Sequence, residues 1–404
     1  MWTPHGHLTY CTNIHAGESW KDHFAALQHH LPQVKKALSA DQPFGIGLRL
    51  SHQASVELNQ AGVLSEFKRW LRQEDCYVFT MNGFPYGGFH HVAVKDQVHA
   101  PDWTTQQRVD YTIRLFDILS ELLPENMEGG ISTSPLSYKY WHKAEQQVNV
   151  FEQTTQHIVQ VIDHLIKIKT KTGQLLHLDI EPEPDGLLES GPEFFDWYDR
   201  YLLPMGMAHL QKQWGYSEEA SVQTIKDHLQ LCYDVCHFAV GYEDHAEVVK
   251  QLQAKQIKVG KIQISAALKS SMPADLSQRE DVVQAFRQFN EATYLHQVVA
   301  RQQEGTLKRY PDLPEALKQA DDRATQEWRS HFHVPLFVED YGVLQSTQED
   351  IRKVLSIHRA QPFTQHLEVE TYTWEVLPEA LKVPLTDSII REVGWVKDYL
   401  NTVD

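Results

Sequence analysis

The feature of this sequence that most constrains its fold is an alternation of short apolar runs with longer stretches of helical periodicity. Eight apolar runs are rich in β-branched and aromatic residues, and each is followed by a stretch of helical period. This order is typical of repeated βα units, and eight parallel strands is the number that closes an α/β barrel. The predicted strands are 8–14, 44–50, 77–82, 130–134, 175–180, 231–238, 259–265 and 367–375.

The stretches between these strands predict helices that would cover the barrel wall. The clearest is 147–169, where Phe151, Ile158 and Leu165 lie on one stripe, and a Lys-Thr-Gly sequence ends it. The other predicted helices are 19–38, 55–72, 105–123, 243–254, 348–359 and 386–400.

Two stretches are longer than a simple connection. They are 187–230, after the fifth strand, and 268–333, after the seventh, and both have a mainly helical composition. The second of them ends in a further strand-like run, 331–339. We therefore expect an α/β fold of the (β/α)8 TIM-barrel type, as a single domain over 1–404. Helical insertions after strands 5 and 7 would shape its active site.

Composition and charge exclude several classes of protein. The 404 residues include 37 Lys and Arg against 54 Asp and Glu, a net charge of −17, with no Lys- or Arg-rich run. A nucleic-acid partner is therefore not expected. Neither a signal-peptide pattern nor a long uninterrupted apolar window is present, which predicts a cytoplasmic protein without membrane insertion. A small-molecule metabolite is the expected partner, and homo-oligomerisation stays open.

The first candidate site lies at the end of the predicted fifth strand. In a βα barrel, functional side chains project from the C-terminal ends of the strands. Here Asp179, Glu181 and Glu183 occupy alternate positions, so they share one face. Three carboxylates on one face repel one another unless protons or a cation intervene, and a divalent metal ion with oxygen ligands is the economical explanation. An acidic, solvated strand end is the alternative.

The next three strands add oxygen donors. Asp234 lies in the apolar run LCYDVCHFAV, where an unpaired charge would be costly. Gln263 alternates with isoleucines in VGKIQIS, and the last strand carries glutamates at 368, 370 and 375, the last of them just ahead of a turn. Glu181, Asp234, Gln263 and Glu375 would supply one donor from each of four consecutive strands.

These motifs resemble those of the xylose isomerase-like TIM barrels, a superfamily of sugar and sugar-phosphate isomerases and epimerases. The E-P-E-P run at 181–184 and the D-x-x-H run at 234–237 are similar to its fifth- and sixth-strand signatures. Most members have histidine on the seventh strand, where this chain has Gln263. In this respect the chain resembles the hydroxypyruvate isomerase branch, which has glutamine there. At a finer level, TYCTNIHAGESW, FPYGGFHH and HFHVPLFVE resemble the EboE group of metabolite traffic proteins, which belongs to a gene cluster tied to a secondary metabolite.

The resemblance implies a divalent metal ion, with Mn, Mg, Co and Zn not distinguished, held by Glu181, Asp234, Gln263 and Glu375. Such an ion would bind the carbonyl and hydroxyl oxygens of the substrate and stabilise an enediolate. Glu181 and Glu375 would act as general acid and base on opposite sides of one carbon. The implied reaction is isomerisation or epimerisation of a small sugar, polyol or cyclitol-like metabolite.

The remaining polar residues near strand ends are expected to bind substrate. They are Asn13, His15, Asn82, Glu183, His237, His331 and His333. His331 and His333 stand two apart, so on a strand they would point the same way and would be able to bind a second metal or replace Gln263.

Two other functions stay open. One is a barrel that binds or hands on a metabolite without turning it over. The other is a phosphodiesterase similar to endonuclease IV, with a histidine-rich multi-zinc site, although the charge of −17 argues against the basic groove it would need.

Overall fold

Eight parallel strands form the centre of the molecule in the computed structural model, which describes residues 1–90 and 92–402. In chain order they are β2 Gly6–Tyr10, β3 Phe44–Arg49, β4 Cys76–Asn82, β5 Gly129–Thr133, β6 Leu176–Ile180, β7 Leu229–Asp234, β8 Val259–Ile264 and β15 His366–Val369.

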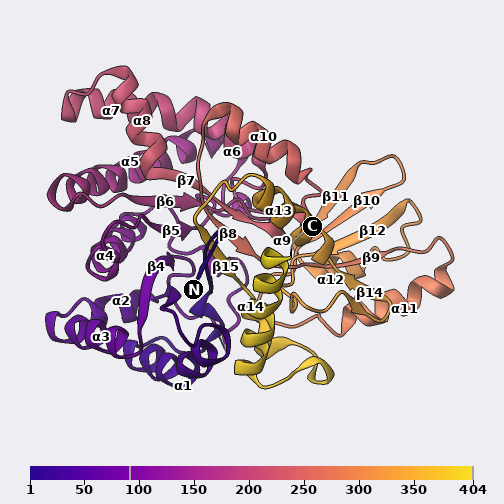
Figure 1. Cartoon of the computed structure of the whole chain (residues 1–404). Coiled ribbons are helices and arrows are strands. Elements are labelled where there is room, and N and C mark those ends of the chain that lie inside the picture. The colour runs from indigo at the N-terminus through magenta and orange to yellow at the C-terminus, as the bar shows by residue number, and fades with distance from the viewer. Residues whose placement is uncertain (91, 403–404) are drawn as a thin grey trace.

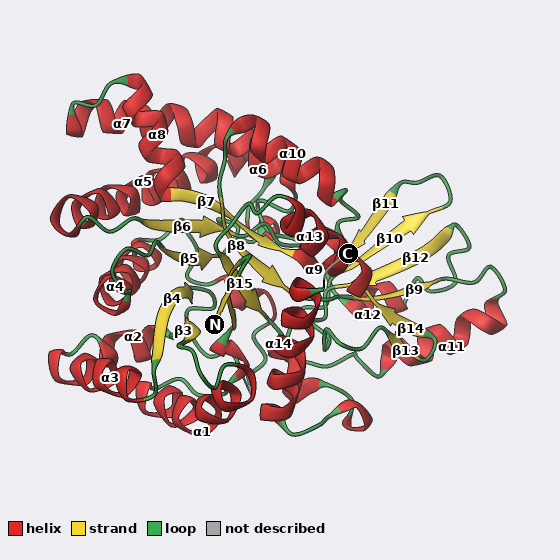
Figure 2. Cartoon of the chain, in the orientation of Figure 1, coloured by secondary structure: helices red, strands yellow, loops and turns green. Residues whose placement is uncertain are grey.

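These strands close into a barrel. β15 lies between β2 and β8, each other strand lies beside its neighbours in the chain, and a parallel bridge from Cys11 to Gly47 joins the β2 and β3 ends of the series. The short strand β1 Trp2–Thr3 pairs antiparallel with β2. The strand order and its closure confirm the predicted (β/α)8 barrel (Figure 2).

Helices surround the barrel on its outer face (Figure 1). α5 Gln147–Thr172 buries the predicted stripe and ends at Gly173, whose φ of 78° is a left-handed C-cap. The stretch 55–72, predicted as one helix, is two. The other helices outside the insertions are α1 Trp20–Leu38, α2 His52–Leu58, α3 Ala61–Gln73, α4 Gln106–Leu122, α9 Val235–Val240, α10 His245–Lys255, α13 Gln348–Ala360 and α14 Leu385–Asn401.

The first insertion, 187–230, is helical, as its composition predicts. It contains α6 Gly191–Trp197, the π-helix η5 Tyr198–Leu202, α7 Leu203–Trp214 and α8 Glu218–His228.

The second insertion differs from the predicted helical stretch. Between β8 and β15 the chain forms a six-stranded sheet of antiparallel pairs, in the order β11-β10-β12-β9-β14-β13. Its strands are β9 Leu268–Ser271, β10 Val298–Gln302, β11 Leu307–Tyr310, β12 Thr325–Ser330, β13 Asp340–Tyr341 and β14 Leu344–Ser346, and its helices are α11 Leu276–Arg287 and α12 Leu313–Leu317. The strands are short and pair mostly with distant segments, so periodicity along the chain does not reveal them.

The run 331–339, predicted as strand-like, is an irregular connection between β12 and β13. Pro335 lies within it and has no backbone N–H to donate to a sheet. The same hydrophobic core includes Ile262 of the barrel and Phe286 and Trp328 of the insertion, so the two sheets pack together.

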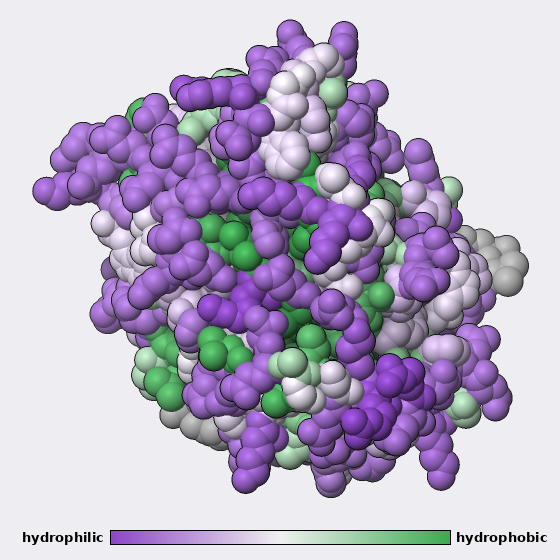
Figure 3. Space-filling view, turned by 90° about the vertical axis from the view of Figure 1, so that its left-hand side faces the viewer, coloured by the Kyte–Doolittle hydropathy of each residue, from purple (hydrophilic) through white to green (hydrophobic). Residues whose placement is uncertain are grey.

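None of the described helices is both long enough and apolar enough to cross a membrane. Figure 3 views the end of the barrel at which β6 and β7 begin, where polar residues dominate and apolar side chains show near the middle. The candidate site lies at the opposite end, where these strands finish.

Candidate metal and substrate site

Three carboxylates meet at the C-terminal mouth of the barrel. Glu181 follows β6, Asp234 ends β7 and Glu370 follows β15, and one oxygen of each lies within 4.8 Å of the other two. All three residues are buried. The strand alternation places them there because they continue the inward-facing positions of their strands.

Gln263 of β8 lies at the centre of this group. Its amide nitrogen donates to Glu181 Oε1 at 2.9 Å, Asp234 Oδ2 at 3.2 Å and Glu370 Oε2 at 2.7 Å. Its amide oxygen accepts from the Cys232 thiol at 3.0 Å. The neutral amide thus connects three acidic side chains that would otherwise repel one another.

Burial and mutual repulsion change the acidity of this cluster. Burial, and then Asp234 and Glu183, raise the pKa of Glu181 well above its usual range. Burial, followed by Glu181 and Asp234, does the same to the pKa of Glu370. Burial also acts to raise the pKa of Asp234, but His237 and its other neighbours outweigh burial and lower that pKa. Asp234 is therefore the member most strongly held as a carboxylate.

The donor set fits a divalent cation. Three carboxylates and one amide provide the oxygen ligands that hard ions prefer, once the Gln263 amide turns its oxygen toward the cluster. Glu181 Oε2 is buried without a hydrogen-bond partner among the described residues, so an acceptor is available for a cation. The structure brings together Glu181, Asp234 and Gln263, three of the four predicted ligands, and their binding of a metal ion stays a prediction.

Glu375, the fourth predicted ligand, does not join them. β15 ends at Val369, and the chain turns into the 3-10 helix η6 Tyr372–Val376 instead of continuing as a strand to 375. The Glu375 side chain is 36% exposed, and its Oε2 lies 3.8 Å from His90 Nδ1. Glu370 occupies the position in the cluster that was predicted for Glu375. The alternation of His366, Glu368 and Glu370 in the sequence was the signal that pointed to it.

Two of the predicted substrate residues position Glu370. The side-chain amides of Asn13 and Asn82 donate to Glu370 Oε1 at 2.8 and 2.9 Å. Both asparagines also line the pocket above the carboxylates. Because one oxygen of Glu370 accepts both amides, its other oxygen, Oε2, is the one that faces Gln263.

His15 lies away from this pocket. The chain leaves β2 through the 3-10 helix η1 Thr12–Ile14, which ends the strand alternation on which the prediction depended. The His15 Nε2 atom lies 3.1 Å from the Tyr10 hydroxyl, and its ring stacks on His30 at 4.6 Å between centroids. It is therefore a packing residue of the barrel wall.

The other four predicted substrate residues do gather at the mouth. Glu183 and His237 line the pocket together with His331. His333 lies beside it, with Nδ1 donating to the Glu370 carbonyl oxygen at 3.1 Å. Burial lowers the pKa of His333 to about 4, so its ring is neutral near pH 7.

One layer deeper, the barrel interior holds a buried ion pair and a buried histidine–carboxylate contact. Lys261 donates to Glu368 Oε1 at 2.8 Å, and His177 Nδ1 lies 2.6 Å from Asp179 Oδ1. Asp179, predicted to share a face with Glu181 and Glu183, does so but pairs with His177 below them. The positive charge of Lys261 acts to lower the pKa of Glu181, against the larger effect of burial.

The walls of the pocket are mainly apolar. The cavity measures about 40 Å³. Phe89, Val94 and Tyr294 line it and form a small hydrophobic cluster that is separate from the main core. Phe89 lies 5.0 Å from Tyr294 and 5.1 Å from Tyr372 between ring centroids.

No family model and no curated protein matches this chain. Several solved structures do resemble it. The IolI protein with a bound zinc atom is 12% identical, with a TM-score of 0.48 and 98% of each chain covered. The probable 3-DHS dehydratase AsbF of Bacillus anthracis, involved in petrobactin synthesis, is 11% identical, with a TM-score of 0.44, covering 96% of this chain and 97% of that one.

A xylose isomerase domain protein from Alicyclobacillus acidocaldarius subsp. acidocaldarius is 9% identical, with a TM-score of 0.45, covering 98% of this chain and all of the other. The barrel fold rests on the strand order. The chemistry has to be argued from the site itself.

Proposed function

We propose that this chain is a metal-dependent isomerase or epimerase that acts on a small α-hydroxy-carbonyl metabolite of the sugar, polyol or cyclitol type. The observation that supports it best is the convergence of Glu181, Asp234 and Glu370 around the Gln263 amide at the base of a pocket. As part of this proposal, the reaction belongs to a secondary-metabolite pathway, which the EboE resemblance of the sequence supports.

A divalent cation held by these four residues would polarise the substrate carbonyl and acidify the neighbouring C–H bond. Glu181 is the better base for that proton, because its Oε2 has no hydrogen-bond partner among residues 1–90 and 92–402. Glu370 returns a proton from the other side of the carbon.

The surrounding residues have supporting roles. Asp234 is held as a carboxylate by the Ser265 hydroxyl at 2.7 Å and by the His237 backbone N–H at 3.1 Å, so it binds rather than transfers protons. Asn13 and Asn82 fix the orientation of Glu370. The aromatic side chains above exclude water from the reacting carbon.

Solvent deuterium exchange tests this function. The protein is loaded in turn with Mn²⁺, Mg²⁺, Co²⁺ and Zn²⁺ and incubated in D₂O with a panel of α-hydroxyketones, from tetruloses to hexuloses and cyclic inososes. We expect an isomer or epimer that carries deuterium at the carbon next to the carbonyl, detected by NMR and mass spectrometry.

The glutamates provide matched variants. Glu181→Gln and Glu370→Gln should each lower the exchange rate by about two orders of magnitude or more, as for loss of a general acid or base. Glu375→Gln should keep it, because Glu375 lies outside the cluster. Equal losses in all three variants would contradict the assignment.

Two other outcomes would point to the alternatives. Thermal stabilisation by a panel compound without deuterium exchange would indicate a barrel that binds a metabolite without converting it. Hydrolysis of bis(p-nitrophenyl) phosphate by the metal-loaded protein, without exchange, would indicate a phosphodiesterase.

A further inference from the structure

A hollow of about 990 Å³ opens at the N-terminal end of the barrel, opposite the carboxylate cluster. It lies between the strands β1 and β2 and the residues at which β5, β6 and β15 begin. Figure 3 looks onto this end of the barrel, where apolar side chains show near the middle of a polar surface. The proposed function uses none of the residues that border this hollow.

Three rings form a row along one side of the hollow. His366 of β15 lies beside His7 of β2, and His7 lies opposite Trp2 of β1. The rings of Trp2 and His7 meet edge to face at 4.7 Å between centroids, and the rings of His7 and His366 both contact Phe79. The row runs from the barrel interior, where His366 is 1% exposed, to the surface, where Trp2 is 53% exposed.

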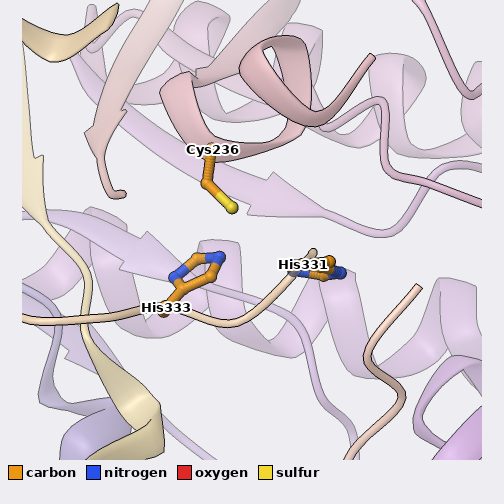
Figure 4. Close-up of side chains that lie close together, drawn as sticks. All are labelled: Cys236, His331 and His333. Carbon is orange, nitrogen blue, oxygen red and sulfur yellow. The ribbon is translucent and has the colours of Figure 1, made fainter. Parts of the chain in front are cut away.

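His366 is a buried side chain that borders the hollow with unused polar atoms. Neither of its ring nitrogens has a hydrogen-bond partner in the described part of the chain. The histidines at the other end of the barrel differ. His331 and His333, which lie beside Cys236 in Figure 4, each have a hydrogen-bond partner at Nδ1. Because an unpaired polar atom is costly to bury, His366 is prepared for a partner that the chain itself does not supply.

Both histidines of the row are uncharged near pH 7. Burial, and then His177, His7 and Lys261, hold the pKa of His366 well below its usual range, against a smaller raising effect of the Glu128 backbone. Burial also lowers the pKa of His7 to about 4. A neutral imidazole keeps one nitrogen lone pair, so His366 is able to accept a hydrogen bond from a ligand.

Carboxylates give the rim of the hollow a negative charge. Glu121, Glu125 and Glu128 border it, and its described lining includes neither lysine nor arginine. Glu121 pairs with Lys68 at 2.8 Å, which leaves the charges of Glu125 and Glu128. A negative rim beside an exposed tryptophan ring favours a cation, because the ring face attracts positive charge as the carboxylates do.

We propose that this hollow binds a small organic cation that combines an aromatic ring with a primary ammonium group. The ammonium has three hydrogens to donate, which matches the lone pair of His366 and the carboxylates of Glu125 and Glu128. The ring of the ligand packs against Trp2. This inference goes beyond the proposed function, because the hollow shares no residue with the carboxylate cluster.

Calorimetric titration of the full-length protein with three related probes tests the charge preference. Tryptamine carries the ring and the ammonium, tryptophol has a neutral hydroxyl in place of the ammonium, and indole-3-acetate has a carboxylate. We expect one tryptamine per chain with a Kd of about 1 mM or lower, binding of tryptophol that is at least about tenfold weaker, and no measurable binding of indole-3-acetate.

Substitutions locate the site. Trp2→Ala should weaken tryptamine binding at least about tenfold because it removes the ring contact, and Glu125→Gln/Glu128→Gln should do the same because it removes the charge. These three residues are exposed or partly exposed, so the variants keep the test valid if His366→Phe does not fold. His366→Phe keeps a ring but removes the buried acceptor, and it should also weaken binding.

Controls separate loss of the site from general effects. Tyr140→Ala removes another exposed aromatic side chain, 56% exposed, and Glu379→Gln removes an exposed carboxylate elsewhere. Both should bind tryptamine as the native protein does. Glu370→Gln should also keep tryptamine binding, which distinguishes the hollow from the carboxylate cluster, the other acidic site that an amine could enter.

Tryptamine that does not bind at about 10 mM, or that binds no more tightly than tryptophol, would overturn the proposal. Unchanged binding in Trp2→Ala and Glu125→Gln/Glu128→Gln, with loss in Glu370→Gln, would also overturn it and would assign the amine to the mouth of the barrel. The titration does not involve deuterium exchange, so failure of the proposed function would leave its result unaffected, and the reverse also holds.

Discussion

Among the single residues of the candidate site, Gln263 has the largest effect on the charge balance. Its amide nitrogen donates to Glu181, Asp234 and Glu370, so a neutral group joins three carboxylates where a fourth carboxylate would add to their repulsion. Lys261 on the same strand supplies a buried positive charge one layer below. The cluster therefore remains compatible with burial even before an ion binds, because the amide and Lys261 both reduce its net repulsion.

Gln263→Glu would remove that compensation. A fourth buried carboxylate without a partner should destabilise the metal-free protein by about 3 kcal/mol at neutral pH, as when a buried charge loses its partner. Thermal melting with and without Mn²⁺ measures this. The metal-induced rise in Tm should be larger in Gln263→Glu than in the native protein, and an equal rise in both would contradict the role given to the amide.

The raised pKa of Glu181 predicts a pH dependence of stability. Between the unfolded pKa of glutamate and the higher folded pKa of Glu181, the metal-free folded state binds one more proton than the unfolded state, so stability falls as pH rises. The slope attributable to this group is up to about 1.4 kcal/mol per pH unit. Urea denaturation of the chelator-treated native protein and Glu181→Gln, at several pH values, should show a shallower fall in the variant.

Among the structural elements, the segment formed by 84–90 and 92–98 lies over the pocket. Its Phe89 and Val94 form a cluster with Tyr294 of the insertion, and this cluster is separate from the main core. A cavity of about 40 Å³ is smaller than a sugar-sized ligand needs. The substrate of the proposed function would need this segment to move outward.

Phe89→Ala should make that movement easier. It removes the ring contacts of Phe89 with Tyr294 and Tyr372, each worth about 1 kcal/mol, as well as its contact with His90. We expect amide hydrogen exchange within 84–90 and 92–98 to rise at least about tenfold, measured by mass spectrometry, while the strands of the barrel stay protected. Val92→Ala is the control in the same segment, because Val92 is 54% exposed. Unchanged exchange in Phe89→Ala would mean that other contacts hold the cover.

Element boundaries also explain which parts of the site were predictable. All eight barrel strands follow from local patterns, because parallel strands buried on both faces leave continuous apolar runs. The position of Glu181, Asp234 and Gln263 follows from the same patterns. The end of β15 does not, because the apolar pattern runs on to 375 while the strand stops at Val369 and η6 follows, so the pattern predicts Glu375 where the structure has Glu370. The insertion strands were missed because β9 pairs with β12 and β14, more than fifty residues away.

For the whole molecule, metal removal is the simplest global test. An ion that binds only the folded state adds about 2.7 kcal/mol to the free energy of unfolding when its concentration is a hundred times its Kd. Chelator treatment should lower the Tm of the native protein by several degrees, and graded Mn²⁺ should restore it. Glu370→Gln should respond less. A Tm independent of metal in the native protein would exclude binding at the carboxylate cluster.

The position of β15 has a consequence for how the chain folds during its synthesis. β15 lies between β2 and β8 in the sheet, yet it is the last barrel strand to leave the ribosome. Until it emerges, the strands on either side of its place keep unpaired edges, which are prone to join other chains. The insertion sheet between β8 and β15 prolongs that interval. We therefore expect nascent chains that stop before residue 366 to be held by chaperones.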